Sequence, residues 1–326
     1  MIHARIIGTG SYAPKKVLTN HDLEKMIDTS DEWIVERTGI RERRVVERGQ
    51  TATDLAYEAG IKAIRSAGLD AKDIDLILVA TSTPDMIMPS LACMLQHRLH
   101  AKQAAAFDIS AACSGFIYGL SVANAFIRSE QYANVLVVGA EATSKFIDWE
   151  DRATCVLFGD GAGAVVLQRH AGKRGILSTH LHADGALGGL LHIPGGGALH
   201  PPSHDTVYKR MHYMKMKGNE LFKVAVRALE DVVKEALVHN KIAPEEIDLL
   251  IPHQANLRII QAMAQRLKMP MEKVVLTIHK YGNTSAASIP MALDEAVRCG
   301  RVKDHDLILF EAFGGGLTWA SALIRW

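Results

Sequence analysis

Hydrophobic residues follow two different spacings along this chain, and each spacing predicts a different element. Residues 53–80 combine apolar positions at helical spacing with a run of consecutive apolar residues, which predicts an amphipathic helix, a short link and a buried strand. Residues 221–253 repeat this order and include a second apolar run at 247–251. A loop and a further helix follow each strand, at residues 91–99 and 257–267. The repetition indicates one structural unit that occurs twice.

The correspondence continues toward the C-terminus. In each half, a short apolar strand leads into a turn of small residues and a helix, and then come another apolar strand, a glycine-rich bend and a last strand. Strands that are apolar on both faces and alternate with helices are typical of an α/β fold. We therefore expect an α/β protein of two similar halves, residues 1–172 and 173–326, stacked around a shared layer of helices. The matched segments are residues 107–109 and 274–278, 110–115 and 281–288, 135–138 and 307–310, and 158–161 and 313–316.

The two halves differ by added segments. The first half contains an insertion at residues 143–157, and a polar, glycine-rich excursion over residues 184–215 begins the second half. Because loops added to a duplicated scaffold commonly carry substrate recognition, we expect these segments to lie near the functional site.

Composition and charge narrow the possible partners. The chain has 326 residues, of which 48% are hydrophobic and 22% are charged, as in a packed globular protein. Its net charge of +1 lacks the basic excess of a dedicated nucleic-acid binder, so we expect no nucleic-acid partner. No run approaches the roughly 18–20 apolar residues that span a bilayer, and the start has no signal-peptide core. We expect a cytoplasmic protein with no membrane partner.

Cysteine and histidine spacing argues against metal sites and disulfides. The 4 cysteines lie far apart without a Cys-x-x-Cys pair, and the 15 histidines show no metal-binding spacing. Residues 159–164 imitate the glycine fingerprint of dinucleotide-binding proteins, but an apolar strand rather than a helix follows them. We therefore expect free thiols, no metal and no nicotinamide cofactor.

Cys113 is the strongest candidate nucleophile. It lies within residues 111–115 (AACSG), between a predicted strand and a predicted helix. The positive end of a helix favours a thiolate, and small neighbours let a substrate approach closely. A buried, unreactive thiol is the alternative for any cysteine, and we assign it to Cys93, Cys155 and Cys299.

The second half contributes two further candidates. Asn283 lies in the turn 281–285, which corresponds to the Cys113 turn, and His253 follows a buried strand. Asn283 alone could be a helix cap, and a lone histidine is more often structural. Cysteine, histidine and asparagine at comparable ends of a duplicated fold instead indicate one catalytic set. Glycines 314–316 would allow backbone N–H groups to approach a reacting carbonyl.

Taken together, these motifs resemble those of the β-ketoacyl-acyl-carrier-protein synthase III family. These enzymes are the initiating condensing enzymes of bacterial fatty-acid synthesis and belong to the thiolase-like superfamily. The resemblance covers essentially the full chain and implies a thiolase-like duplicated fold in five layers, α-β-α-β-α. Its motifs are residues 28–34 (DTSDEWI), 37–41 (RTGIR), 112–115 (ACSG), 253–256 (HQAN), 281–285 (YGNTS) and 313–316 (FGGG).

The resemblance also implies a reaction in two steps. Cys113 would take the acyl group from an acyl-CoA, most simply acetyl-CoA, and the backbone N–H groups of Cys113 and Gly316 would hold the oxyanion. His253 and Asn283 would then stabilise the enolate that malonyl-acyl-carrier protein forms on losing carbon dioxide. This chemistry needs no metal and no redox cofactor.

Binding residues follow from the same resemblance. Trp33 and Arg152 would sandwich the adenine of CoA, and Arg37 would hold its phosphates. The pantetheine tunnel would be lined by Asn219, Phe222 and Asn256. The carrier-protein surface would comprise Gln254, Ala255, Asn256, Leu257 and Arg258, together with Lys223 and Arg266.

The resemblance further implies a homodimer, in which one residue at the acyl pocket comes from the partner subunit. Met88 occupies the place that often holds phenylalanine in this family. Because methionine is flexible and fills irregular space, we expect the acyl pocket to accept primers longer than acetyl.

Several rival functions remain open or are disfavoured. A thiolase needs a second catalytic cysteine where this chain has Asn283, and Cys299 lies well within the following helix. An elongating synthase needs a second histidine, which the 281–285 turn does not supply. A condensing enzyme for secondary metabolites would share the same three residues. A non-catalytic acyl-CoA-binding protein on this fold is disfavoured by the presence of all three.

Overall fold

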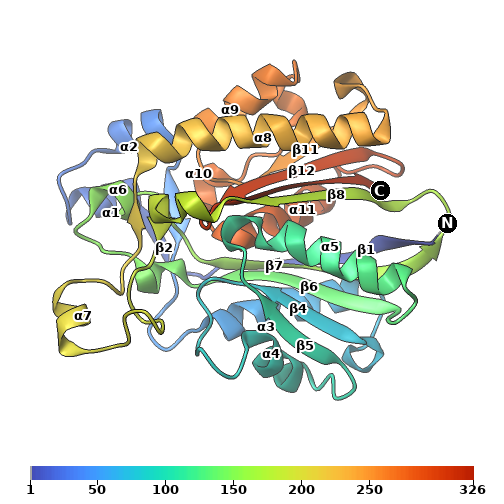
Figure 1. The fold of residues 1–326 in the computed structure, drawn as a ribbon, viewed down its shortest axis with the longest axis horizontal. Coiled ribbons are helices and arrows are strands. Elements are labelled where there is room, and N and C mark those ends of the chain that lie inside the picture. Colours follow the sequence, from blue (N-terminus) through green and yellow to red (C-terminus); the bar gives the residue numbers. More distant parts are fainter. Residues whose placement is uncertain (1) are drawn as a thin grey trace.

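Two β-sheets lie face to face in the computed structural model, which describes residues 2–326 (Figure 1). The N-terminal sheet has the strand order β1-β7-β6-β4-β5. In this sheet β4 is parallel to β5 and β6, whereas β7 is antiparallel to β6 and β1. Its strands are β1 (Ile2–Tyr12), β4 (Leu76–Ala80), β5 (Ala105–Ile109), β6 (Asn134–Glu141) and β7 (Gly161–Ala171).

The C-terminal sheet has the order β11-β12-β13-β8, with β11 parallel to β12 and the other pairs antiparallel. Each sheet is formed by its own stretch of chain, because β7 ends the first and β8 begins the second. The strands of this sheet are β8 (Gly175–Ala183), β11 (Leu249–Pro252), β12 (Leu307–Gly314) and β13 (Thr318–Arg325).

Helices form three layers around these sheets. α5 (Gly115–Arg128) and α11 (Ser288–Arg298) lie between the sheets, where one apolar cluster joins residues of both sheets to both helices (Figure 1). The outer face of the N-terminal sheet packs on α3 and α4, and that of the C-terminal sheet packs on α8 and α9. The expected five-layered, thiolase-like α/β fold is confirmed. The outer helices are α3 (Ala52–Ser66), α4 (Leu91–Leu99), α8 (Gly218–Asn240) and α9 (Leu257–Arg266).

Strand β4 illustrates why these sequences form central strands. All its residues are buried, with Leu76 and Leu78 facing the inner helices and Ile77 and Val79 facing the outer ones. Such a strand gains roughly 1.5–3 kcal/mol for each large aliphatic side chain that it buries, on both faces of the sheet. The continuous apolar runs seen in the sequence are the consequence.

One predicted strand is largely missing. The segment 274–278 pairs with β11 only through the bridge between Val274 and Leu250, and α10 (Ile278–Tyr281) begins directly afterwards. The buried side chain of Gln254 accepts hydrogen bonds from the backbone N–H groups of Thr277 and Ile278 at 2.9 and 3.1 Å. The prediction of a strand over these residues was wrong because a side chain takes the place of a strand partner.

The remaining elements are short and lie at one end of the sheets, where the figure places α1, α2, α6 and α7 (Figure 1). The two added segments meet there, since the Met214 N–H donates to the Phe146 carbonyl at 2.8 Å and Arg210 forms ion pairs with Asp148 and Glu150. These elements are β2 (Val17–Thr19), α1 (Asn20–Glu24), α2 (Asp31–Thr38), β3 (Glu42–Arg44), α6 (Arg152–Cys155), β9 (Leu191–His192), α7 (His204–Tyr208) and β10 (Lys215–Met216). The short 3-10 turns are η1 (Ala71–Asp73), η2 (Ala112–Ser114), η3 (Thr143–Phe146), η4 (Gly185–Leu190), η5 (Pro244–Glu246), η6 (Met271–Lys273) and η7 (Ser285–Ala287).

Across residues 2–326, the structure contains no helix with the length and apolar character needed to cross a membrane.

Candidate active site

A cavity of about 600 Å³ opens between the two halves. Cys113, His253 and Asn283 all line it, although they come from three separate segments of the chain. The structure thus brings together the three residues that the sequence analysis selected.

Cys113 lies in η2, at the start of α5, and is 5% exposed. Its turn is fixed to β13, because the Thr318 hydroxyl donates to the Ala111 carbonyl at 2.8 Å and the Ser114 hydroxyl donates to the Thr318 carbonyl at 3.0 Å. Gly314 packs directly against this turn, since a side chain on it would lie 2.6 Å from the Cys113 nitrogen. Gly314, the first glycine of the FGGG motif, is therefore required by its close packing against the turn that carries the nucleophile.

The protonation state of Cys113 differs from the expectation. Burial raises the pKa of its thiol to about 12, and the charge of Glu141 contributes to this rise. The prediction of a thiolate is wrong for the unliganded site, because loss of water outweighs the favourable helix N-terminus. The sulfur of the unliganded site therefore carries a proton at pH 7.

His253 follows β11 and is 6% exposed. Its backbone N–H donates to the Glu311 carbonyl at 2.8 Å, and its ring Nδ1 lies 2.6 Å from the hydroxyl of Ser288, the first residue of α11. Burial lowers the pKa of the imidazole to about 3. The ring is thus neutral at physiological pH and suited to donate one hydrogen bond rather than to carry a charge.

Asn283 is held from both sides. Its backbone N–H donates to the Leu157 carbonyl at 2.9 Å, and its carbonyl accepts from the Gly159 N–H at 3.0 Å. The side-chain Oδ1 accepts from the Ser285 N–H at 2.8 Å. Since Oδ1 is engaged, the side-chain NH2 group is left to donate to a ligand in the cavity.

Glu311 is a cavity residue that the sequence analysis missed. It lies on β12, is 1% exposed, and its Oε2 atom has no hydrogen-bond partner among residues 2–326. Burial raises the pKa of this carboxyl to about 8, so it is uncharged at pH 7. The signal was present in the sequence as one acidic residue inside an otherwise apolar strand.

We expect the Glu311→Gln variant to lose part of the pH dependence of stability. The native carboxyl keeps its proton up to a pKa of about 8, whereas the unfolded one has the ordinary value of 4.5. Between these values the native state binds more protons, so stability falls as pH rises through this window. The effect is on the order of a few kcal/mol for a fully buried group. Thermal unfolding at pH 5 and pH 8 measures it.

The exposed substitution Glu245→Gln provides the matched control for Glu311→Gln. We expect the Glu311 variant to gain stability relative to the wild type as pH rises from 5 to 8, and the control to follow the wild type. An identical pH dependence in all three proteins would show that Glu311 is ionised in the native state.

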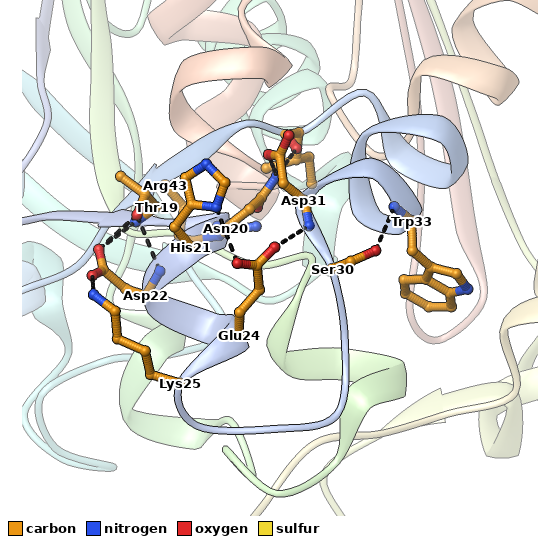
Figure 2. Close-up of polar contacts among 11 residues, drawn as sticks. Thr19, Asn20, His21, Asp22, Glu24, Lys25, Ser30, Asp31, Trp33 and Arg43 are labelled. Carbon is orange, nitrogen blue, oxygen red and sulfur yellow. Dashed lines mark hydrogen bonds and ion pairs between the residues drawn. The ribbon is translucent and has the colours of Figure 1, made fainter.

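Trp33 projects from α2, the helix that also carries the cavity residue Arg37 (Figure 2). The Ser30 hydroxyl caps this helix by accepting from the Trp33 N–H at 3.1 Å, and the Glu24 carboxylate accepts from the Asp31 N–H at 2.6 Å (Figure 2). The guanidinium groups of Arg37 and Arg152 lie 4.9 and 4.8 Å from the centre of the indole ring. The three side chains predicted to bind CoA therefore form one cation–π cluster.

The predicted tunnel residues also lie together. Asn219, Phe222 and Asn256 line the cavity, as does Arg37. The Asn256 side chain donates to the Arg37 carbonyl at 3.1 Å and accepts from the Arg258 N–H at 2.8 Å, so it caps α9 as well. The cap fixes the start of α9 at the wall of the cavity.

The segment expected to contact a carrier protein is only partly at the surface. Gln254 is 1% exposed, and its amide also donates to the carbonyls of Pro252 and Val275 at 2.9 and 3.1 Å. The expectation that the Gln254 side chain contacts a carrier protein is wrong, because all its polar atoms bind the backbone around it. Ala255 lines the cavity, and Leu257 packs against Gly39.

The three basic residues of that surface differ in their pairing. Arg258 lies 3.3 Å from Glu36, and Arg266 forms an ion pair with Glu230. Lys223 lines the mouth of the cavity and has no ion-pair partner within the described chain. Of the three basic residues that the sequence analysis grouped, Lys223 therefore supplies the positive charge that is not balanced by an ion pair.

Two further predicted residues lie outside this cavity. Gly316 adopts φ 132°, which favours glycine, but Gly314 rather than Gly316 lines the cavity. Met88 is 85% exposed and does not line the cavity of its own chain.

No group of three or more His, Cys, Asp or Glu side chains within residues 2–326 is arranged to hold a metal ion.

Comparison with known proteins agrees with this geometry. Residues 107–185 match the family model of 3-oxoacyl-[acyl-carrier-protein (ACP)] synthase III, and residues 237–326 match the model of its C-terminal part. The β-ketoacyl-[acyl-carrier-protein] synthase III of Alkalilimnicola ehrlichii is 58% identical, over 100% of both chains.

Solved structures extend the similarity. The crystal structure of 3-oxoacyl-[acyl-carrier-protein] synthase III from Aquifex aeolicus is 55% identical, with a TM-score of 0.93 over 99% of this chain and 100% of that one. The priming β-ketosynthase of a polyketide biosynthetic pathway is 36% identical, with a TM-score of 0.92 over 99% of this chain and 96% of the other. On this evidence, the chain belongs to the β-ketoacyl-acyl-carrier-protein synthase III family.

Proposed function

We propose that this chain condenses an acyl-CoA primer, most simply acetyl-CoA, with malonyl-acyl-carrier protein. The products are a 3-oxoacyl-acyl-carrier protein, carbon dioxide and CoA, and the reaction starts fatty-acid synthesis. The observation that carries the proposal is the convergence of Cys113, His253 and Asn283 on one cavity. The roles below are those that the family resemblance implies, and the positions and protonation states of these side chains support them.

In the first step, the Cys113 sulfur attacks the thioester carbon of the primer. The thiol loses its proton as the bond forms, and CoA leaves as a thiol after taking up a proton. The oxyanion of the tetrahedral intermediate would accept a hydrogen bond from the backbone N–H group of Cys113, which lines the cavity. The family resemblance gives the Gly316 N–H as the second donor, although Gly314 rather than Gly316 lines the cavity, so substrate binding would have to bring that N–H group to the oxyanion. Such donors act where charge develops and therefore lower the barrier directly.

In the second step, the malonyl group loses carbon dioxide and the electron pair passes into an enolate. We assign the ring proton of His253 to Nε2, because the Ser288 hydroxyl also accepts weakly from the Gln254 N–H at 3.4 Å and so directs its hydrogen to Nδ1. Nε2 and the Asn283 NH2 group then donate to the thioester oxygen. The enolate carbon attacks the acyl group, and Cys113 departs as a thiolate.

CoA would bind along the wall formed by α2, α8 and α9. Adenine has an extended π-face and can stack on Trp33 in exchange for one of the guanidinium groups that lie there. Arg152 would cover the other face of the adenine, Arg37 would hold the phosphates, and the pantetheine arm would pass Asn219, Phe222 and Asn256. An acidic carrier protein would approach Lys223, with Arg258 and Arg266 beside it.

We further propose a homodimer formed along β5. This strand is the edge of the N-terminal sheet, and Phe107 on it is 39% exposed. Nearby, Met86, Ile87 and Met88 are also exposed. An apolar sheet edge of this kind is usually covered by a partner. In such a dimer Met88 would reach the acyl pocket of the partner subunit.

Supplying both substrates tests the proposed reaction. With acetyl-CoA and malonyl-acyl-carrier protein, we expect carbon dioxide and a 3-oxoacyl-acyl-carrier protein in equal amounts. Omitting either substrate should remove both products. Tight binding of acetyl-CoA without either product would instead support a non-catalytic acyl-CoA-binding protein.

Primer length tests the proposed role of Met88. We expect measurable condensation with butyryl-CoA as well as acetyl-CoA, because a flexible methionine leaves room that a rigid ring would fill. Initial rates with acetyl-, butyryl- and octanoyl-CoA decide this. Strict use of acetyl-CoA would contradict the role given to Met88.

A second candidate is a priming condensation for a secondary metabolite. The similarity of this chain to the priming β-ketosynthase of a polyketide pathway supports this second function. The two functions share the chemistry and differ in the carrier protein, so turnover with the carrier proteins of the two pathways separates them.

A further inference from the structure

Arg43, on β3, is the largest side chain of the described chain that is completely buried. Its guanidinium donates to the Leu18 carbonyl at 3.2 Å, the Asn20 side-chain oxygen at 2.8 Å and the Val156 carbonyl at 2.7 Å. Burial lowers the pKa of this guanidinium to about 10, so the group is still charged at pH 7. A buried charge whose hydrogen bonds go to neutral acceptors is costly, so stability alone does not explain its presence.

The Val156 carbonyl begins the segment that holds Asn283. The next carbonyl along the chain, that of Leu157, accepts from the Asn283 backbone N–H at 2.9 Å. The Gly159 N–H donates to the Asn283 carbonyl at 3.0 Å. Both backbone partners of Asn283 therefore follow directly after the carbonyl that the guanidinium binds.

The first carbon of the Arg43 side chain packs against the same turn. A Cβ on Gly282, the residue before Asn283, would lie 3.2 Å from the Arg43 Cβ, and a Cβ on Gly159 would lie 3.1 Å from it. Gly282 adopts φ 64°, which favours glycine. Arg43 thus contacts the Asn283 turn directly, while its guanidinium fixes the segment that pairs with this turn.

Asn20 connects the guanidinium to the start of α2 (Figure 2). The Asn20 amide donates to the Asp31 carboxylate at 2.8 Å, and Asp31 is the first residue of α2. Val156, which offers its carbonyl to the guanidinium, is the residue that ends α6. Since α2 and α6 carry the cation–π cluster, one buried side chain joins both of these elements to the Asn283 turn.

We propose that Arg43 is a positioning residue that holds Asn283 in its donating orientation during condensation. This inference rests on the proposed function of Asn283 as a donor to the enolate oxygen. Arg43 does not line the cavity, so it acts through the backbone on either side of Asn283.

The chemistry of arginine suits this role. The donors of a guanidinium form a rigid planar fork, so one group can hold three acceptors from separate segments at fixed distances. A lysine ammonium on its flexible stem cannot do so. The Asn283 NH2 group must meet an oxygen whose charge develops in the transition state, and a misplacement of about 1 Å can cost roughly 100-fold in rate.

Acylation should not depend on Arg43. The Cys113 turn is fixed by other contacts, in which the hydroxyl and carbonyl of Thr318 on β13 bind Ala111 and Ser114. The two half-reactions therefore rest on different supports, and loss of the Arg43 fork should affect only the second.

The Arg43→Lys variant tests the inference, with Arg325→Lys as the matched control. Arg325 also donates to a backbone carbonyl, that of His305 at 3.1 Å, but it lies at the opposite end of β13 from Thr318. We expect Arg43→Lys to lower the maximal rate of condensation by roughly 10- to 100-fold and to change acylation at saturating acetyl-CoA by less than about threefold. The control should keep both rates.

Rapid-quench acylation and steady-state carbon dioxide release give these two rates. Equal losses of acylation and condensation in Arg43→Lys would show a general structural defect and would overturn the proposal. Unchanged condensation would overturn it as well.

A double-mutant cycle separates the positioning of Asn283 from any other effect of Arg43. In an Asn283→Ala background no donor remains to be positioned, so adding Arg43→Lys should slow condensation by no more than about twofold. Losses that multiply in the double variant would show that Arg43 acts independently of Asn283, which would refute the inference.

The Asn20→Ala variant keeps the inference testable if Arg43→Lys does not fold. It removes one of the three acceptors of the guanidinium and leaves the bond to Val156 in place. We expect condensation to slow by roughly 3- to 10-fold, with acylation at saturating acetyl-CoA unchanged. An equal loss in both rates would contradict the inference, whereas full condensation activity in Asn283→Ala would instead refute the proposed function of Asn283.

Discussion

The Cys113→Ser variant is expected to lose both acylation and condensation, by at least roughly a thousandfold. A serine hydroxyl is a far weaker nucleophile than sulfur, and this cavity offers it no strong base, because burial lowers the pKa of His253 to about 3. Incubation with radiolabelled acetyl-CoA, followed by separation of protein from free label, measures the first loss.

The Cys93→Ser variant is the matched control for that substitution. Cys93 is exposed on α4 and does not line the cavity. We expect it to keep wild-type acylation. Wild-type labelling in Cys113→Ser, or loss of labelling in Cys93→Ser, would place the acyl group elsewhere.

Replacing His253 or Asn283 by alanine is expected to separate the two half-reactions. Each variant removes one hydrogen bond to the enolate oxygen, and one such donor is worth roughly 10²–10³ in rate. Acylation of Cys113 does not use these donors, so its rate should change by less than about tenfold. Rapid-quench acylation and steady-state carbon dioxide release give the two rates.

Conservative variants sharpen this separation. His253→Gln keeps a side-chain N–H donor and should recover part of the condensation rate, whereas Asn283→Asp replaces the donor by an acceptor and should not. The roles assigned here would be contradicted if both alanine variants lost acylation to the same extent as Cys113→Ser.

The neutral state of His253 also affects how the rate of condensation depends on pH. Because burial lowers the pKa of its imidazole to about 3, its titration lies well below the physiological range. The donor on Nε2 therefore persists between pH 5 and pH 8, and condensation in this range should show no limb belonging to His253.

The layers of the fold could be predicted because strands such as β4 are apolar on both faces. That pattern occurs where a strand is covered on both sides by helices, and its repetition indicated two sheets. The segment 274–278 was misjudged for a physical reason. Its apolar pattern suits a strand, but the Gln254 side chain binds the backbone groups that a neighbouring strand would need.

The positions of Cys113 and Asn283 could be predicted because each lies at a turn of small residues in one of two matching halves. Their protonation and orientation could not, since these depend on burial and on contacts that are distant in sequence. The pKa of Cys113 reflects enclosure on all sides, and the orientation of Asn283 depends on the Ser285 N–H.

Glu141 and Glu311 were both visible in the sequence as acidic residues in apolar strands. Their surroundings differ in a way that sequence does not reveal. Glu141 is surrounded by hydrogen-bond donors, whereas Glu311 has an oxygen without a partner in the described chain. Only the folded geometry separates a bridging carboxylate from an isolated acid.

Mass spectrometry of the intact wild-type protein tests the central claim, that the acyl group passes through Cys113, most directly. After incubation with acetyl-CoA, we expect the mass to increase by one acetyl group, located on the peptide that contains Cys113. Adding malonyl-acyl-carrier protein should return the protein to its original mass as carbon dioxide is released. Product formation without an acetylated Cys113 peptide, or an acetyl group that persists after malonyl-acyl-carrier protein is added, would contradict the account.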